Sequence, residues 1–468
     1  MASDELCFTS ATELARRVRS KELSPVEIMQ AVLARIEALN PRLNAFCTLT
    51  GERALDAARN AEKALAAGKP LGPLHGVPFS VKDLVITKGL RTMRGSKIYE
   101  SWVPEEVTPA VERLRAAGGI LLGKTTTPEF GWKGVTDSPV TGITRNPWNL
   151  EMTPGGSSGG AAAQVAAGMG PLAIGTDGGG SIRIPAAFSG IYGLKPSYGR
   201  VPTYPASNHD QLSHMGPLTR TVADAALLLS LMAGPHDCDR FSLEAPPADY
   251  VGLLERGIKG LRVAWSPDLG YAAVHPEVAT VCDRAARAFE GLGASVDEVE
   301  PGIGDPTDIF IPLYVLGVGG GLADLLPKWE SQLDPGLVTL VRMAASFKGL
   351  DAARAQIARH QFWERVRRFF ERYDLLLTPA LAVPAFRVGQ LTPEPAKAGL
   401  RDMFAWTPFT YPFNLTGNPA ASVPVGFTDD GLPVGLQIVG RRFADLTVLQ
   451  ASRAYEQAHP WADKRPAL

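Results

Sequence analysis

The feature of this sequence that most limits its fold is the alternation of short apolar runs with longer segments of helical periodicity. From Gly76 onward, the amphipathic stretch "TPAVERLRAAGG" lies between the apolar runs "VPFSV" and "ILLG". The same order returns with "LRVAW" (261–265), a helical pattern over 276–292 and "SVDEVE" (295–300). Short apolar runs are typical of buried strands, and strands that alternate with helices assemble into α/β folds.

The C-terminal half extends this pattern. We expect strands over 374–379, 421–426 and 433–440, a mostly helical segment over 302–370 and a closing helix over 446–457. The central sheet is therefore predicted to take strands from both halves of the chain.

The N-terminal segment has a different pattern, with helix-capping signals in place of short apolar runs. Ser10 and Ser24 each precede a glutamate at the position that completes a capping box, which predicts that the first 65 residues are helices. No long polar linker divides the 468 residues. The sequence therefore predicts a single large α/β/α domain over residues 1–468, with N-terminal helices (1–65) packed on it.

Charge and cysteine content exclude several function classes. The 47 Lys and Arg residues nearly balance the 48 Asp and Glu residues, and the net charge of −1 gives no indication of nucleic-acid binding. The N-terminus has acidic residues and lacks the apolar core of a signal peptide, which predicts a cytoplasmic protein. We expect neither a metal site nor a disulfide framework, because four cysteines lie far apart without a C-x-x-C pair: Cys7, Cys47, Cys238 and Cys282.

The longest uncharged apolar stretch runs from Ile309 to Ala323. It is shorter than the roughly 20 residues that span a bilayer, and it contains Pro312 and three consecutive glycines. We therefore expect no membrane span here. The stretch is predicted to lie in the core or to form one wall of an apolar pocket.

One match to a phosphate-binding loop is rejected on its context. The residues from Gly118 to Thr125 fit the pattern G-x-x-x-x-G-K-T, but that motif needs a strand before it and a helix after it. Here a helical pattern precedes the match, and its interior is apolar like a buried strand. The sequence therefore does not predict a nucleotide site.

Three segments carry residue types suited to nucleophilic catalysis. In "IGTDGGGSIRIPA", an apolar run leads to Ser181 and a helical pattern follows it. Three glycines, Gly178, Gly179 and Gly180, leave backbone N–H groups free to stabilise a developing oxyanion. A plain glycine turn with a capping serine is the alternative.

In "PGGSSGG", Ser157 satisfies the G-x-S-x-G pattern of a nucleophile elbow. No strand leads into it, because the preceding residues "TRNPWNLEMTP" are polar and contain two prolines. Ser157 is therefore not expected to be an elbow nucleophile, although it can relay a proton.

The candidate base is Lys82 in "PLHGVPFSVKD". The seven histidines lie outside the serine segments. The residues before Lys82 are nearly free of charged side chains, which indicates that the lysine is buried. Burial favours the neutral amine, which can act as a base. An ion pair of Lys82 with Asp83 is the structural alternative.

Together these segments resemble the amidase signature family, whose members hydrolyse amides with a Ser-cisSer-Lys triad. The bridging and nucleophilic serines of that family have the spacing of Ser157 and Ser181. The motifs "TRNPWN" and "NLTGNPAASVPVG" also match the family. The resemblance implies a mixed, twisted central sheet, Ser181 as nucleophile, Ser157 as bridge after a cis peptide bond, and Lys82 as base. Gly178, Gly179, Gly180 and Ser181 would supply the oxyanion hole, Ser158 would brace the loop, and no metal or organic cofactor is needed.

Substrate specificity in this family lies in a variable segment, here about 302–410. Members that form the amidase component of a tRNA amidotransferase carry an aspartate where this chain has Thr407, which weakens that assignment. An ion pair of Arg183 with Asp177 is an alternative to substrate binding. The candidate substrate-binding residues are Met152, Thr153, Arg183, Phe409 and Tyr411.

The sequence thus favours a stand-alone amide hydrolase that acts on a small, apolar or aromatic carboxylic amide, with esters or carbamates as further substrates. A glutaminase subunit of a tRNA-dependent amidotransferase and a non-catalytic binding protein on the same fold are the alternatives. Beyond a small-molecule substrate we expect neither nucleic acid nor membrane as partners, and homodimerisation stays open.

Overall fold

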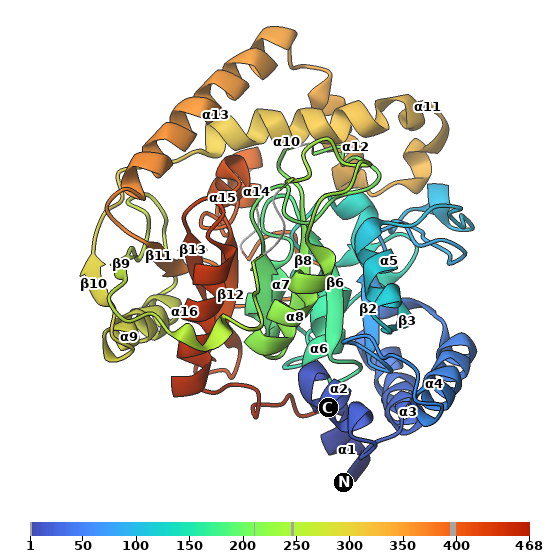
Figure 1. Cartoon of the computed structure of the whole chain (residues 1–468). Coiled ribbons are helices and arrows are strands. Elements are labelled where there is room, and N and C mark those ends of the chain that lie inside the picture. The colour runs from blue at the N-terminus through green and yellow to red at the C-terminus, as the bar shows by residue number, and fades with distance from the viewer. Residues whose placement is uncertain (1, 210, 245–247, 394–398) are drawn as a thin grey trace.

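The computed structural model describes residues 2–209, 211–244, 248–393 and 399–468, and a mixed sheet of 11 strands lies at the centre of this part of the chain (Figure 1). The strand order across the sheet is β1-β3-β2-β6-β8-β7-β12-β13-β11-β9-β10. Two further short strands, β4 (Asp137–Ser138) and β5 (Gly142–Ile143), pair separately. The strands of the large sheet are β1 (Phe46–Leu49), β2 (Pro78–Lys82), β3 (Ile120–Thr125), β6 (Leu172–Asp177), β7 (Tyr192–Lys195), β8 (His214–Thr219), β9 (Arg262–Trp265), β10 (Ser295–Glu298), β11 (Leu375–Pro379), β12 (Ala420–Phe427) and β13 (Pro433–Gly440).

Helices surround this sheet in the described part of the chain. Helices α10, α12 and α13 lie across one end of it in Figure 1, and α1 to α4 gather at the opposite end. The helices are α1 (Ala2–Cys7), α2 (Ala11–Arg19), α3 (Pro25–Leu43), α4 (Gly51–Ala66), α5 (Pro109–Ala116), α6 (Gly159–Ala166), α7 (Arg183–Ser189), α8 (Val222–Met232), α9 (Pro276–Gly291), α10 (Thr307–Leu322), α11 (Leu326–Trp329), α12 (Pro335–Ala344), α13 (Gly349–Phe369), α14 (Leu400–Phe404), α15 (Pro412–Thr416) and α16 (Asp445–Ala458).

Successive residues of β6 show how helices cover both faces of the sheet, because neighbouring side chains of a strand point to opposite faces. Leu172 and Ile174 lie in a core that they share with α5, α8, α9 and α16. Ala173, between them, packs with residues of α6 and α7 instead. The α/β fold class with helices on a large mixed sheet, as predicted from the sequence, is confirmed.

Strand directions place the candidate site. β2 runs parallel to β6, so both strands end on the same side of the sheet, where their carboxyl ends lie next to each other. Lys82 is the last residue of β2, and Thr176 and Asp177 end β6. The segment that contains Lys82 is thereby brought beside the segment that leads to Ser181.

Three strands of the large sheet, and the short pair β4 and β5, are absent from the sequence prediction. β1 interrupts the N-terminal segment, which is therefore not entirely helical, and pairs with β3 at the edge of the sheet. β7 is only four residues long, and β8 contains Gly216 and Pro217, which disfavour strands. Pairing with β6 and β7 holds β8 in the sheet despite this composition.

The capping sequences also differ in outcome. Ser24 completes a full capping box with Glu27 at the start of α3. Ser10 accepts a hydrogen bond from the Glu13 N–H, but the Glu13 carboxylate pairs with Arg16 rather than with the backbone of Ser10. Only half of the first predicted box is formed.

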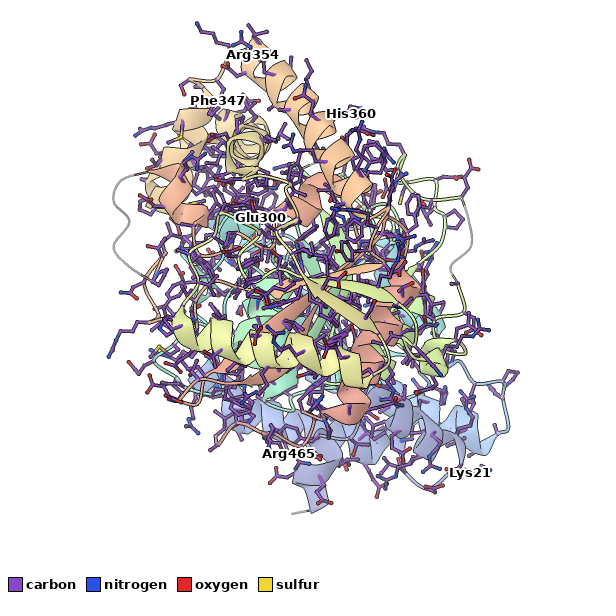
Figure 2. All side chains as sticks on the ribbon, turned by 90° about the vertical axis from the view of Figure 1, so that its left-hand side faces the viewer. Lys21, Glu300, Phe347, Arg354, His360 and Arg465 are labelled. Carbon is purple, nitrogen blue, oxygen red and sulfur yellow. The ribbon has the colours of Figure 1, made fainter. Side chains whose placement is uncertain are left out.

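The apolar stretch 309–323 lies within α10 and the turn that follows it. The helical run Thr307–Gln332 has the length and composition of a membrane span, although a core helix of a soluble protein satisfies the same criteria. Phe310, Val315 and Val318 of this run are buried in a core shared with α12 and α13. Figure 2 shows this end of the molecule, with Phe347, Arg354 and His360 on the side away from Lys21 and Arg465.

Candidate active site

Lys82 is buried at the end of β2 and contacts two hydroxyl groups. Its Nζ lies 2.8 Å from Ser157 Oγ and 3.0 Å from Thr176 Oγ1. Burial lowers the pKa of the Lys82 ammonium well below its ordinary value, and the negative charge of Asp177 offsets only part of this shift. Lys82 is therefore poised to exchange a proton with Ser157.

The alternative pairing of Lys82 with Asp83 is not formed in the described structure. The Asp83 carboxylate accepts a hydrogen bond from the Met93 N–H at 2.9 Å. Burial raises the pKa of Asp83 to about 6, while the positive charge of Lys124 and backbone N–H groups act in the opposite direction. The two adjacent ionisable side chains thus bind different groups: Lys82 contacts Ser157 and Thr176, and Asp83 binds the Met93 N–H.

Ser157 lies in a glycine-rich loop that packs closely on its surroundings. The peptide bond between Gly156 and Ser157 is cis, as the sequence resemblance implied. A Cβ on Gly156 would lie 2.7 Å from the Val135 carbonyl oxygen, so only glycine fits there. This close contact fixes the backbone that presents Ser157 to Lys82.

Ser158 braces this loop against β6, as expected. Its hydroxyl donates to the Thr176 carbonyl oxygen at 3.2 Å and accepts from the Thr176 N–H at 3.3 Å. Its N–H donates to the Ser181 carbonyl oxygen at 3.1 Å. The two serine loops are therefore joined through Ser158.

Ser181 lies in the turn between β6 and α7 and lines the same cavity as Ser157. No hydrogen bond joins Ser157 Oγ to Ser181 Oγ among the residues that the structure describes. The two hydroxyls nevertheless face one cavity of about 100 Å³. A proton relay between them requires that the Ser181 hydroxyl turn toward Ser157.

The glycine loop before Ser181 supplies fewer free donors than the sequence predicts. The Gly180 N–H donates to the Asp177 carboxylate at 2.7 Å, so it is not free to bind an oxyanion. The N–H groups of Gly178, Gly179 and Ser181 have no acceptor within the described residues. Those three are the available donors, and the prediction for Gly180 is corrected.

Arg183 is fully buried and is not among the residues that line the cavity. Two of its donors bind the Asp177 carboxylate, at 2.9 and 3.0 Å, and the other three bind the Thr410 carbonyl oxygen, Gln437 and Asn414. All five N–H groups of the guanidinium thus have protein acceptors. The structural ion pair is observed, and the substrate-binding prediction for Arg183 is corrected.

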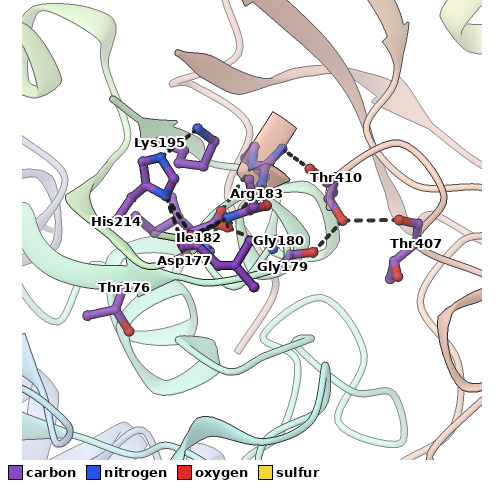
Figure 3. A network of polar contacts seen from close by, with 12 residues as sticks. Thr176, Asp177, Gly179, Gly180, Ile182, Arg183, Lys195, His214, Thr407 and Thr410 are labelled. Atoms are coloured by element: carbon purple, nitrogen blue, oxygen red, sulfur yellow. Dashed lines mark hydrogen bonds and ion pairs between the residues drawn. The ribbon is translucent and has the colours of Figure 1, made fainter. Parts of the chain in front are cut away.

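Asp177 is the centre of this network. Although burial favours the neutral acid, the Arg183 guanidinium holds the pKa of Asp177 well below its usual range. The carboxylate also accepts the N–H groups of Gly180 and Ile182, at 2.7 and 3.2 Å (Figure 3). One buried pair therefore sets the shape of the turn that carries Ser181.

The other predicted substrate-binding residues do not line the cavity either. Met152 and Thr153 lie in the strand-like contact with 386–387 behind it. Phe409 is buried in the core, and the Tyr411 hydroxyl is directed to Thr307 at 2.8 Å. The "FTYPF" segment contacts the pocket wall instead, because the Tyr411 ring stacks on the cavity-lining Phe310 with centroids 4.8 Å apart. The aromatic side chains that line the cavity are Phe130, Trp132, Phe310, Tyr314, Phe404 and Trp406.

Comparison with known proteins places this site in a family. The sequence model described as "Amidase" matches residues 27–449. The chain belongs to the amidase family. It is therefore an enzyme that hydrolyses carbon–nitrogen bonds.

Individual relatives of this amidase cover the whole chain or nearly all of it. An acylamidase of Rhodococcus erythropolis is 45% identical over 100% of this chain and 99% of its own. A component of the glutamyl-tRNA(Gln) amidotransferase of Geobacter metallireducens is 37% identical over 99% of this chain and 100% of its own. Among solved structures, a bacterial aryl acylamidase of the amidase signature family has a TM-score of 0.91 at 33% identity and covers 98% of this chain and 99% of its own.

The histidines of this amidase stay outside the contacts of Lys82, Ser157 and Ser181 in the described structure. His214 is buried, with Nδ1 2.8 Å from the Leu212 carbonyl oxygen. His209 lines the cavity, where its ring stacks on Tyr314 with centroids 4.7 Å apart. Burial lowers the pKa of His209 to about 4, so the ring is neutral at pH 7.

The rejected phosphate-loop match is a strand in this amidase. β3 covers Ile120–Thr125, and Lys124 is buried with its Nζ 3.2 Å from the hydroxyls of Thr87 and Thr92. The described residues contain no cluster of three or more metal-ligating side chains. The contact that sequence reasoning missed is Thr176, whose hydroxyl binds Lys82.

Proposed function

We propose that this amidase acts alone on a small, apolar or aromatic carboxylic amide, through an acyl-enzyme on Ser181. The observation that carries the proposal is the 2.8 Å contact of a buried Lys82 with Ser157, which lines one cavity together with Ser181 and the free backbone donors. Esters and carbamates with similar substituents are further candidate substrates.

In the proposed mechanism, neutral Lys82 takes the proton of Ser157 while Ser157 takes the proton of Ser181. The Ser181 oxygen forms a bond to the amide carbonyl carbon, and the N–H groups of Gly178, Gly179 and Ser181 stabilise the oxyanion. The C–N bond then breaks as the protonated relay returns a proton to the leaving amine. Water hydrolyses the resulting ester and releases the carboxylic acid.

The lining of the cavity supports the substrate class. Six aromatic side chains surround the space next to Ser181, and Lys133 in the same wall is neutralised by Asp137 and Asp334, each at 2.7 Å. Such a surface favours an apolar or aromatic group. Residues from 302–410, including Phe310 and Phe404, contribute to this wall, in line with the predicted specificity segment.

Position 407 distinguishes this proposal from the glutaminase alternative. Thr407 lines the cavity, and its hydroxyl donates to the Phe404 carbonyl oxygen at 3.1 Å. A threonine at this place offers no negative charge to a substrate ammonium. The amidotransferase relatives nevertheless keep the glutaminase alternative open, and the experiment must separate the two functions.

The test is product release from aryl amides, aliphatic amides, esters, carbamates and glutamine by the purified chain. We expect turnover of aryl or aliphatic amides without a partner protein and none by Ser181→Ala. Turnover of glutamine alone would instead support the amidotransferase function. Equal rates for wild type and Ser181→Ala on every substrate would contradict the assigned nucleophile.

A further inference from the structure

Arg94 follows β2 in the chain and has an unusual environment. Its guanidinium carbon lies 5.0 Å from the ring centroids of both Tyr99 and Trp102. Within the described residues its side chain makes no hydrogen bond and no ion pair, and Nε is buried without an acceptor. A partly desolvated guanidinium normally has a carboxylate or carbonyl partner, because its loss of hydration is otherwise not offset.

Arg94 lines a second cavity, of about 130 Å³, that adjoins the catalytic one. Leu84, Phe130, Thr176 and His209 line both cavities. Thr176 is the residue whose hydroxyl binds Lys82. A ligand that fills both cavities therefore extends from the catalytic lysine and serines toward Arg94.

The second cavity has one charged side chain among its described lining residues. Apart from Arg94, the lining consists of apolar, aromatic, hydroxyl and amide side chains and of His209. Burial lowers the pKa of His209 to about 4, which leaves this ring uncharged at pH 7. Among the described lining residues, no acidic side chain thus neutralises the positive charge of Arg94 and no second cation adds to it.

The backbone of Arg94 is fixed relative to the catalytic residues. Its N–H donates to the carbonyl oxygen of Asp83 at 3.2 Å, and Asp83 directly follows Lys82 in the sequence. Its carbonyl oxygen accepts from the Phe130 N–H at 2.8 Å. Its φ of 54° lies in the left-handed region that side chains other than glycine rarely adopt. These contacts aim the side chain from a defined position beside the pocket wall.

We propose that Arg94 binds a carboxylate of the substrate, so that the amides cleaved best by this enzyme carry an anionic group on one side of the scissile bond. The planar guanidinium presents paired N–H donors that match the two oxygens of a carboxylate. The aromatic wall that both cavities share accommodates the group between the carboxylate and the amide. This inference rests on the proposed function and specifies its substrate class.

Matched substrate pairs test the inference. N-Phenylsuccinamate and butyranilide differ by a carboxylate on the acyl side, and 4-acetamidobenzoate and 4-methylacetanilide differ by a carboxylate on the amine side. We expect the wild-type kcat/KM to favour the anionic member of at least one pair by about tenfold or more. Arg94→Gln should abolish this preference, and Arg94→Lys should retain part of it.

A neighbouring arginine provides the control. Arg91 lies on the same loop, is exposed, and binds the Cys47 carbonyl oxygen outside both cavities. Arg91→Gln should keep the wild-type preference. The inference is overturned if wild type treats both members of each pair alike, or if Arg94→Gln lowers kcat/KM equally for anionic and neutral members.

A binding measurement separates this inference from the proposed function. Calorimetry with the Ser181→Ala protein needs no turnover, and we expect the anionic member of at least one of the two pairs to bind about tenfold more tightly than its neutral partner. Adding Arg94→Gln should remove that difference. If no amide is hydrolysed by wild type but the difference in affinity is found, the proposed function fails while the anion site stands. Equal affinities within both pairs overturn the anion site itself.

Discussion

A Cβ placed on Gly131 would lie 3.1 Å from Ser157 Oγ and 2.7 Å from Leu84 Cδ1. The candidate bridging serine thus has a neighbour that must be glycine. We expect Gly131→Ala to lower kcat by roughly a hundredfold, because a small displacement of a reacting group has effects of that size. Steady-state kinetics and thermal unfolding of the same preparation would separate catalysis from stability.

The matched control for this change is Gly89→Ala. Gly89 has a φ of 71° against 72° for Gly131, but nothing lies within 4 Å of an added Cβ. Both variants therefore carry the same backbone penalty, and only one of them contacts Ser157. Equal losses of activity in the two variants would show that strain, and not the contact with Ser157, is responsible.

The pKa of Lys82 predicts the pH dependence of the reaction. Since burial lowers this pKa well below 10.5, the neutral amine is available at lower pH than for an exposed lysine. We expect kcat/KM to rise with pH along a limb that ends well below pH 10.5, and Lys82→Ala to cost several orders of magnitude. A rate that is constant from about pH 5 to 9 in the chemical step would argue against a lysine base.

The same shift predicts a stability effect of Lys82→Met. A lysine with a lowered pKa in the folded state binds fewer protons there than in the unfolded chain, so its burial costs free energy below the folded pKa. This cost fades as the pH approaches 10.5, the ordinary value. Urea titrations between about pH 7 and pH 10 should show the free energy of unfolding of the variant falling relative to wild type. A constant difference would indicate that Lys82 keeps its ordinary pKa.

Removal of Arg183 should destabilise the whole protein. Arg183→Met leaves the Asp177 carboxylate buried without its ionic partner, a change that costs about 3–5 kcal/mol in other proteins. Arg287→Met, which removes an exposed arginine from its surface ion pairs, should leave the free energy of unfolding nearly unchanged. Chemical denaturation at neutral pH measures both. A loss for Arg183→Met as small as that for Arg287→Met would contradict the role given to the buried pair.

Thr410 should affect the reaction through the glycine loop. Its hydroxyl donates to the Gly179 carbonyl oxygen at 2.7 Å, next to two of the free backbone donors. Thr410→Val keeps the shape of the side chain and removes this bond together with a longer one to the Thr407 carbonyl oxygen at 3.1 Å. We expect kcat to fall by up to about tenfold with little change in KM. Thr416→Val removes a hydroxyl bonded only within its own helix and serves as the control. A change confined to KM would point to substrate contact instead.

The sequence prediction succeeded where a residue lies in a local sequence motif, and it failed where the position of a residue depends on distant contacts. Lys82, Ser157 and Ser181 could be singled out because glycine-rich turns and a strand end carry their own local pattern, and the family resemblance implied their roles. The structure brings Lys82 into contact with Ser157 and places Ser181 in the same cavity as Ser157. The substrate-binding candidates failed because the direction of a side chain such as Tyr411 depends on its packing against distant residues. β8 was missed for a similar reason, since only its partner strands explain a strand that contains Gly216 and Pro217.

The order of residues around the Arg183 network has a consequence for the synthesis of the chain. Lys82, Ser157 and Ser181 all precede Arg183, but two acceptors of its guanidinium, Asn414 and Gln437, come near the C-terminus. β12 and β13 also lie inside the sheet, between β7 and β11. A nascent chain on the ribosome therefore holds every candidate reactive side chain long before the turn that carries Ser181 is supported. We therefore expect the site to become ordered only as the last strands emerge, and a chain that stops after β11 to retain the reactive groups without an ordered site.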